Sequence, residues 1–317
     1  MEDNLTHRER IGFNVRRGRA SRAVELIQRA ESEGISTVWM TMGAFGSDTL
    51  TLYAAAATKT ISINLGASIV PAFTRHPFTT VSQALVLDDL APGRLRLGVG
   101  TSHGPVMERS FGVPFDKPLT QLREYLQILR PALHEGQVEF SGDYYNVKGR
   151  FPGAPGTPVL ISALGVKAFE TAGELTDGAI SWLVPLSYLR ETAIPAMERG
   201  AQRGNREKRP AMVAHVSVAL ADDESTAFAA ARKEFSLYSG MPFYQQMFAK
   251  TGYPLTDDGE YTDELLRELV VHGDEATISS TLKSLLDHDF DELIVMPVPV
   301  DDRETEEARL LAMIGRL

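Results

Sequence analysis

Residues Pro77–Gly100, PFTTVSQALVLDDLAPGRLRLGVG, form a helix-to-strand unit that decides how the rest of the chain is interpreted. Pro77 stands where the first helical turn begins, a position that tolerates proline, and Phe78–Leu90 continues the helix. Arg94–Val99 is then predicted to be a strand that ends in glycines. Strands that alternate with helices in this way indicate an α/β protein.

The same alternation extends over the chain, which has 317 residues. Eight segments have the patterns of strands, and segments with helical spacing of apolar residues separate most of them. The pattern predicts the α/β fold class and a (β/α)₈ barrel of the TIM type, in one domain spanning residues 1–317. A doubly wound open sheet is the alternative. The predicted strands are Ile11–Val15, Thr37–Met40, Ile61–Val70, Arg94–Val99, Val159–Ile161, Ala179–Trp182, Val213–Ala219 and Glu292–Met296.

Residues 234–273 form an insertion rich in Phe and Tyr between the seventh predicted strand and the last predicted helix. An insertion at the carboxyl end of a barrel strand is placed to cover the active site as a lid. The alternative is an additional pair of helices with a small core of its own. The two interpretations are compatible with each other.

The composition is that of an ordinary globular protein and excludes several classes. Lys and Arg number 32 against 42 Asp and Glu, so the net charge is −10. An acidic chain does not suit binding to a phosphate backbone or an anionic membrane, so we expect neither as a partner. The absence of cysteine excludes disulfides, thiolate metal sites and a cysteine nucleophile. Because Met1–Asn4 is polar and no apolar run approaches roughly 20 residues, we expect a cytoplasmic enzyme.

The turn after the fourth predicted strand is a candidate ligand site. Gly98–His103 begins like a dinucleotide-binding fingerprint but has His103 at the third glycine position. Two glycines still allow a ligand to approach the backbone closely, although a tight turn without a ligand explains them equally well. His103 is the histidine of greatest interest because it follows this turn at the end of a strand.

The segment Ser162–Lys167 follows another predicted strand and opens a helix. Its small residues leave backbone N–H groups free at the positive end of the helix dipole, which suits a phosphate or phosphodiester. Most turns of this kind bind nothing, so the segment alone is a weak signal. No pair of histidines has the i, i+4 spacing of a helical metal site, and we expect no metal.

Seven motifs are distributed over nearly the whole chain. They are Trp39, Leu65–Val70, Thr74–Pro77, Leu87–Gly100, Pro158–Gly165, Gly173–Ala179 and Asp291–Leu293. In this order they resemble the motifs of the bacterial luciferase-like flavin and deazaflavin oxidoreductases. The residues within the motifs are similar to those of the branch that depends on coenzyme F420. The resemblance implies an oxidoreductase that transfers a hydride between F420 and a small organic substrate.

The resemblance also implies where the cofactor binds. Its ring is expected at the carboxyl end of the barrel, against a β-bulge with a cis peptide bond between Ser68 and Ile69. The glycine turn is expected beside the ring, and the segment that opens the helix at Val166 is expected to bind the cofactor phosphate. The implied cofactor-binding residues are Ser68, Ile69, Val70, Gly98, Gly100, Thr101, Ser102, Ala163, Leu164, Gly165, Val166, Lys167, Gly178 and Ala179.

Two positions depart from relatives in this branch. Its sugar-phosphate and alcohol dehydrogenases carry an Asp-His pair after the second strand, where this chain has Thr41–Ala44. The sugar-phosphate enzymes also place a Glu where this chain has Thr101. We therefore expect reduction of an activated C=C, C=N or C=O bond by reduced F420, rather than oxidation of a sugar phosphate or a simple alcohol.

The remaining candidate residues concern the substrate. His103 is the candidate for proton delivery. Asn14 is placed to orient a substrate, and Met42 and Trp182 are placed to line an apolar pocket, although core packing explains both equally well. Two alternatives stay open, an FMN-dependent luciferase-like monooxygenase and a flavin- or deazaflavin-binding protein without turnover. The resemblance further implies a homodimer.

Overall fold

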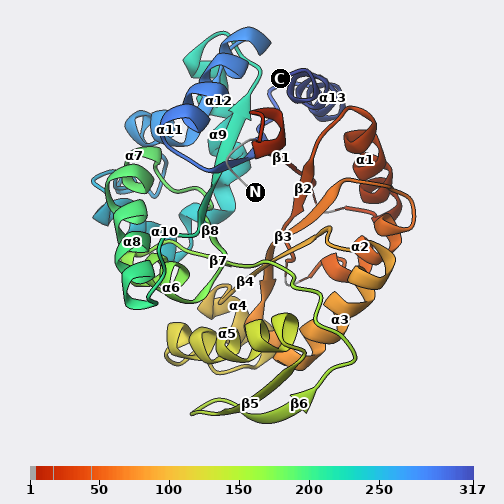
Figure 1. Ribbon diagram of the computed structural model, residues 1–317. Helices are drawn as coiled ribbons and strands as arrows, with labels where there is room; N and C mark the ends of the chain where they lie inside the picture. Colours follow the sequence, from red (N-terminus) through yellow and green to blue (C-terminus); the bar gives the residue numbers. More distant parts are fainter. Residues whose placement is uncertain (1–4, 17, 44) are drawn as a thin grey trace.

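Eight parallel strands close into a barrel, which confirms the predicted fold class (Figure 1). The computed structural model describes residues 5–16, 18–43 and 45–317, so Met1–Asn4, Arg17 and Ala44 lie outside the described residues. The strands, in order around the barrel, are β1 (Ile11–Asn14), β2 (Thr37–Met40), β3 (Asn64–Pro71), β4 (Leu95–Gly100), β7 (Val159–Ser162), β8 (Gly178–Ile180), β9 (Ala211–Ala219) and β11 (Glu292–Pro297). Pairing of β11 with β1 and of β8 with β9 completes the ring.

Helices surround the barrel, as Figure 1 shows. They are α1 (Ala20–Ser32), α2 (Thr49–Ala57), α3 (Pro77–Leu90), α5 (Pro118–His134), α6 (Val166–Leu175), α8 (Ile194–Arg203), α12 (Glu275–His288) and α13 (Arg303–Gly315). Beside α5, the hairpin of β5 (Gln137–Ser141) and β6 (Asn146–Arg150) projects outward, which confirms the hairpin that turn residues 141–143 indicate. Within the described part of the chain, no helix is both long and apolar enough to cross a membrane.

Local signals placed several element ends correctly. Asp48 accepts a hydrogen bond from the Thr51 amide and caps α2, while Gly34 ends α1 with a φ of 88° that favours glycine. The third strand begins at Asn64, so its predicted start at Ile61 is wrong. The reason is a distant side chain: the Glu31 carboxylate accepts the backbone N–H groups of residues 61–63 and holds them in a loop.

Residues 186–203 form a helix in three parts. A short α7 (Leu186–Tyr188) leads into a π-helical stretch, Leu189–Ala193, and then into α8. The sequence analysis did not identify α4 (Gly104–Phe111) or α13. The segment that contains α4 opens at His103, whose side chain makes no capping hydrogen bond, so one of the usual helix-start signals is missing.

The middle of the barrel is filled by a layer of side chains. Trp39, Leu160, Ile180, Val213 and Ile294 form one buried cluster, separate from the apolar shell between barrel and helices. Toward the amino ends of the strands, the guanidinium of Arg96 lies 5.0 Å from the Trp39 ring centroid and pairs with Glu292. The Trp39 layer therefore separates the amino end of the barrel from the carboxyl end, where ligands bind in barrels of this type.

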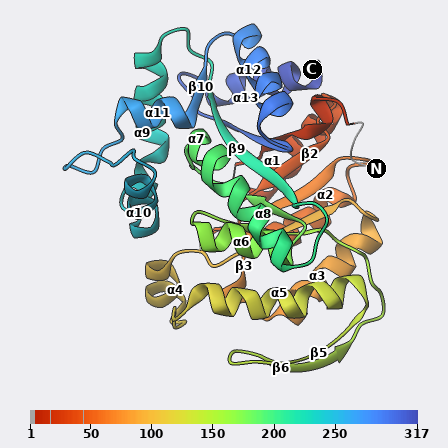
Figure 2. The same ribbon diagram turned by 60° about the vertical axis from the view of Figure 1, so that its left-hand side comes forward.

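The insertion at residues 234–273 forms the end of α9 (Glu224–Ser239), then α10 (Pro242–Lys250), α11 (Asp263–Leu269) and β10 (Val270–His272). Figure 2 shows α9, α10 and α11 grouped on one side of the barrel. Phe248 and Phe235 each pack against Tyr261, so the insertion has aromatic packing of its own. Two of its tyrosines also contact residues at the ends of barrel strands, as described below. The role as a lid stays a prediction.

Candidate active site at the carboxyl end of the barrel

All eight strands run parallel, so their carboxyl ends meet at one mouth of the barrel. Side chains two residues apart on a strand face the same side, so the residues that follow the Trp39 layer face this mouth. Four side chains each stand two residues after a member of the Trp39 layer. They are Thr41 after Trp39, Ser162 after Leu160, Trp182 after Ile180 and His215 after Val213. The mouth is therefore lined by polar and aromatic side chains, in contrast to the apolar layer below it.

Many polar atoms at this mouth are buried without a hydrogen-bond partner among the described residues. A buried donor or acceptor without a partner costs free energy, so a group of them in one place indicates a site where a ligand completes the bonds. The atoms are Asn14 Nδ2, Thr41 Oγ1, Ser68 Oγ, His103 Nδ1, Trp182 Nε1, Ser217 Oγ and both ring nitrogens of His215.

The bulge that the resemblance implies is present on β3. The pairing with β4 shifts register between Ala67 and Val70, and the peptide bond between Ser68 and Ile69 is cis. Ile69 turns inward and packs against the Trp39 layer, and its carbonyl accepts the Met42 amide at 3.3 Å. Val70 is instead buried in the shell between barrel and helices, away from the mouth. A role of Ser68 and Ile69 in cofactor binding stays a prediction.

The glycines of β4 make room for this bulge. A Cβ atom at Gly98 would lie 2.2 Å from the Ala67 carbonyl oxygen and 2.8 Å from Ile180. At Gly100 it would lie 2.3 Å from Ser162 Oγ and 3.0 Å from Ile69. The space beside these glycines is thus filled by the protein itself, which supports packing as the reason for glycine at both positions.

The turn after β4 carries three of the predicted residues. Ser102 has a φ of 61°, and the Thr101 hydroxyl donates to the Ser102 carbonyl at 3.2 Å. His103 comes next, with its ring centroid 5.8 Å from that of Tyr244 in α10. Burial lowers the pKa of His103, so the ring is neutral at pH 7. It offers one N–H donor and one acceptor that can orient a ligand, and its role in proton delivery stays a prediction.

The predicted phosphate segment opens α6. No side chain caps this helix. The Ala168 amide donates to the Gly165 carbonyl at 2.9 Å, which leaves the amides of Val166 and Lys167 without a partner among the described residues. Gly165 and Lys167 are exposed, and a Cβ at Gly165 would meet nothing within 4 Å. The Ala163 amide is not available, because it donates to the Ile180 carbonyl at 3.1 Å. Leu164, between Ala163 and Gly165, is partly buried. The amides available to a ligand are therefore those at the amino end of the helix itself.

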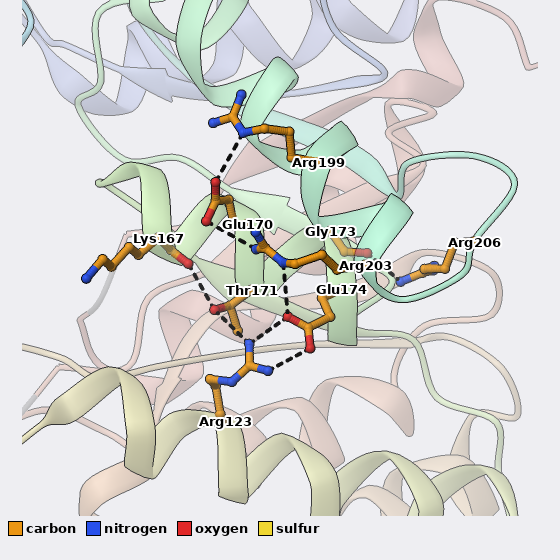
Figure 3. Close-up of polar contacts among 9 residues, drawn as sticks. All are labelled: Arg123, Lys167, Glu170, Thr171, Gly173, Glu174, Arg199, Arg203 and Arg206. Carbon is orange, nitrogen blue, oxygen red and sulfur yellow. Dashed lines mark hydrogen bonds and ion pairs between the residues drawn. The ribbon is translucent and has the colours of Figure 1, made fainter.

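Contacts on the outer side hold α6 in place. Gly173 and Gly200 allow α6 and α8 to cross closely, since a Cβ at Gly200 would lie 2.0 Å from the Glu170 carbonyl oxygen. Ion pairs fasten the same helices and α5, while the Lys167 ammonium points away from them (Figure 3). These pairs are Arg123–Glu174 at 2.7 Å, Arg199–Glu170 at 3.2 Å and Arg203–Glu170 at 3.1 Å.

Two predicted residues do not reach the mouth. Gly178 begins β8 and pairs with Leu160 and Ala211, so it lies at the level of the Trp39 layer. Ala179 is fully buried in the shell against the helices. Their role in lining the cofactor, which the resemblance implies, stays a prediction. Met42 and Asn14 do lie at the ends of β2 and β1, and Arg75 donates to Met42 Sδ at 3.2 Å.

The sequence analysis missed His215, which it placed in a strand without a role. His215 is 3% exposed, and its ring lies 3.9 Å from that of Trp182, centroid to centroid. Burial lowers the pKa of His215 to about 3. The alternation of Val213, His215 and Ser217 within an apolar strand was the available signal, because it puts two polar side chains on the inward face.

His215 should also make the protein sensitive to acid. Its pKa is about 6.5 when unfolded and about 3 when folded, so below pH 6.5 the unfolded chain binds a proton that the folded chain does not. Stability is therefore lost as the pH falls. Urea unfolding measures the free energy of unfolding at pH 7 and at pH 5. Between these two pH values, the loss of this free energy should be about 2 kcal/mol smaller in His215→Phe than in the wild type. His134→Phe, at a histidine bonded to the Thr157 carbonyl, is the control. Equal losses of stability in the wild type and in His215→Phe would contradict the low pKa of His215 in the folded protein.

A cleft of about 700 Å³ opens at the opposite end of the barrel. Its charged side chains are largely engaged with one another and with backbone. Arg209 pairs with Asp291, and Arg10 donates to the carbonyls of Leu286, Phe290 and Asp291. These contacts join the amino ends of β1, β9 and β11, so we assign them to stability. Among the described residues, no group of three or more His, Asp or Glu is placed to hold a metal ion.

The chain is similar to proteins of a known family and to solved structures. The sequence profile described as Luciferase-like monooxygenase matches residues 5–288. A putative coenzyme F420-dependent oxidoreductase from Mycobacterium tuberculosis is 31% identical over 258 residues, which cover 72% of this chain and 73% of that protein.

Two solved structures share the fold. The coenzyme F420-dependent tetrahydromethanopterin reductase of Methanopyrus kandleri superposes with a TM-score of 0.77 at 22% identity, covering 96% of this chain and 97% of the other. The oxygenating constituent of 3,6-diketocamphane monooxygenase of Pseudomonas putida, in complex with FMN, has a TM-score of 0.75 at 16% identity, with 96% of both chains covered.

Proposed function

The chain belongs to the family of luciferase-like monooxygenases and related oxidoreductases, and from this premise we propose that it is an F420-dependent oxidoreductase acting on a small organic substrate. The observation that carries the proposal is the group of unpartnered polar atoms at the mouth, next to the open amino end of α6. The relative named as F420-dependent supports F420 over FMN.

The residues present fit such a cofactor. The first turn of α6 presents free amides to an anionic phosphate, and Lys167 adds a positive charge nearby. Asn14, Thr41 and Ser68 provide donors and acceptors for the heteroatoms of a ring, and the Ser68–Ile69 bulge provides a surface against one ring face. The bulge lies on β3 and α6 follows β7, and these two strands are separated only by β4, so one ligand can span both sites.

When bound, F420 supplies hydride transfer, and the residues of the chain orient the reactants. His103, neutral and next to Tyr244, is placed to donate or accept one hydrogen bond at its unpartnered Nδ1. Tyr238 and Tyr244 of the insertion lie over Trp182 and His103, where they exclude water from the mouth. Without a carboxylate or an Asp-His pair at the positions discussed above, these residues favour reduction of an activated C=C, C=N or C=O bond over alcohol oxidation.

Titration of the purified protein with oxidised F420 and, in parallel, with FMN tests the proposal. We expect F420 to bind with a micromolar or lower Kd and FMN to bind at least tenfold more weakly, measured by ligand fluorescence. The reverse preference would favour an FMN-dependent monooxygenase. Binding of neither would contradict the assignment of the α6 end as a phosphate site. Binding of F420 without hydride transfer to any member of a substrate panel would favour a protein without turnover. The homodimer implied by the resemblance stays a prediction.

A further inference from the structure

Two aromatic side chains at the mouth form a stacked pair to which the function proposed above gives no individual role. His215 comes from the middle of β9, and Trp182 stands two residues after β8. Their ring centroids are 3.9 Å apart, with an angle of 32° between the planes. Among the described residues, neither ring nitrogen of His215 has a hydrogen-bond partner, and the indole N–H of Trp182 has none either.

Such a pair is costly in the ligand-free protein. A neutral imidazole has one N–H donor and one acceptor nitrogen, and burying both without partners destabilises the folded state. Backbone contacts do not explain why histidine stands here, since bonds such as that of its amide to Ser181 Oγ do not involve the side chain. A side chain that is 97% buried, unpartnered and directed into the mouth is best explained by a ligand that completes its bonds.

The pair stands opposite the bulge. In the closed strand order, β9 is four strands from β3 in either direction, so the two face each other across the barrel. This step rests on the proposed function: a cofactor ring held against Ser68–Ile69 turns its other face toward β9. The compound that reacts with the ring must bind on that open face, next to His215.

The contacts that the pair makes with other described residues are with uncharged groups. Ser181 and Ser217 are its polar neighbours on β8 and β9, and Tyr238 lies 6.1 Å from Trp182, centroid to centroid. Burial raises the pKa of Tyr244 well above its usual value, so its phenol also stays neutral. A charged ligand would be buried here without a counter-charge, which is strongly unfavourable.

We propose that His215 and Trp182 form the substrate subsite and that it takes an uncharged conjugated carbonyl compound, whose oxygen accepts a hydrogen bond from the imidazole of His215. An uncharged conjugated carbonyl compound is complementary to the two side chains of the pair. Its oxygen uses the N–H donor, and its conjugated plane packs against the aromatic walls. A carboxylate or phosphate on the compound would lack a partner.

The test uses a matched pair of probes, benzylideneacetone and its para-carboxylate, which differ by one charged group. Calorimetric titration into protein loaded with oxidised F420 measures binding without turnover. We expect the neutral probe to bind at least tenfold more tightly than the carboxylate. His215→Phe should bind the neutral probe at least tenfold more weakly than the wild type does, while its affinity for F420 stays within twofold of the wild-type value. His215→Gln, which keeps a neutral donor and acceptor, should recover part of the loss.

A second measurement separates a ligand-binding histidine from a structural one. Without ligand, His215→Phe should melt a few degrees higher than the wild type, because phenylalanine fills the space without unpartnered atoms. The control His134→Phe breaks the bond to the Thr157 carbonyl, so it should melt lower and leave probe affinity unchanged. A lower melting temperature for His215→Phe, together with weaker F420 binding, would show a structural role and overturn the proposal.

Other outcomes also decide the question. Equal or tighter binding of the carboxylate, unchanged affinity in His215→Phe, or no detectable binding of the neutral probe would each overturn the proposal. If F420 itself does not bind, the same titrations are run on the ligand-free and FMN-loaded protein. A neutral preference that depends on His215 there would support the subsite while contradicting the F420 assignment, so the two failures are distinguishable.

Discussion

Gly98→Ala is expected to lower the free energy of unfolding by about 3 kcal/mol. The added Cβ would lie 2.2 Å from the carbonyl oxygen of Ala67 and 2.8 Å from Ile180. The carbonyl belongs to a strand paired with β4 and β2 on either side, so it has no room to move away. Relief therefore requires a shift of the bulge itself. Urea unfolding of wild type and variant measures the loss.

Gly240→Ala is the matched control for this prediction. Gly240 ends α9 with an ordinary φ of −84°, and a Cβ there would meet nothing within 4 Å. Its stability should stay within about 0.5 kcal/mol of the wild type. If Gly98→Ala were as stable as Gly240→Ala, the packing around the bulge would not be as described. Because the bulge is part of the proposed ring site, Gly98→Ala should also weaken F420 binding.

Lys167→Glu is expected to weaken F420 binding by about 10- to 100-fold, through loss of a positive charge and gain of a negative one at the end of α6. The ammonium of Lys167 has no carboxylate partner among the described residues, and Figure 3 shows it directed away from the Glu170 and Glu174 ion pairs. The substitution therefore breaks no ion pair. Fluorescence titration with F420 at low and high salt measures the effect, which should shrink at high salt.

Lys59→Glu makes the same change in net charge at a distant site. Lys59 is exposed in the loop before β3, at the amino end of the barrel. Its F420 affinity should stay within about twofold of the wild type, because exposed charges farther apart than the Debye length are screened. Equal weakening in both variants would point to overall charge and count against a phosphate site at α6. No change in either variant would place the cofactor phosphate elsewhere.

The local parts of the site could be predicted from the sequence, because each depends on residues close together in the chain. Pro77 and the Asp48 cap mark helix starts, and the small residues before Val166 mark an uncapped helix end. The order of strands and helices leads directly to a parallel barrel. The Ser68–Ile69 cis bulge was implied by resemblance and is present, although no propensity at these residues would indicate it.

The rest depends on contacts between distant segments. Glu31 shortens β3 by binding residues 61–63, and the closure of the barrel brings Trp182 against His215. Val70 and Ala179 face the shell of helices and Gly178 lies at the level of the Trp39 layer, because strand faces and strand lengths are set by the neighbours they pair with.

The sequence by itself therefore determined the fold class, the family resemblance and the helix end proposed for the phosphate. Only the tertiary structure decided which side chains face the mouth and which of their atoms lack partners. The physical reason is that local propensity acts within a few residues, whereas burial and unsatisfied hydrogen bonds arise only when strands far apart in the chain are brought together.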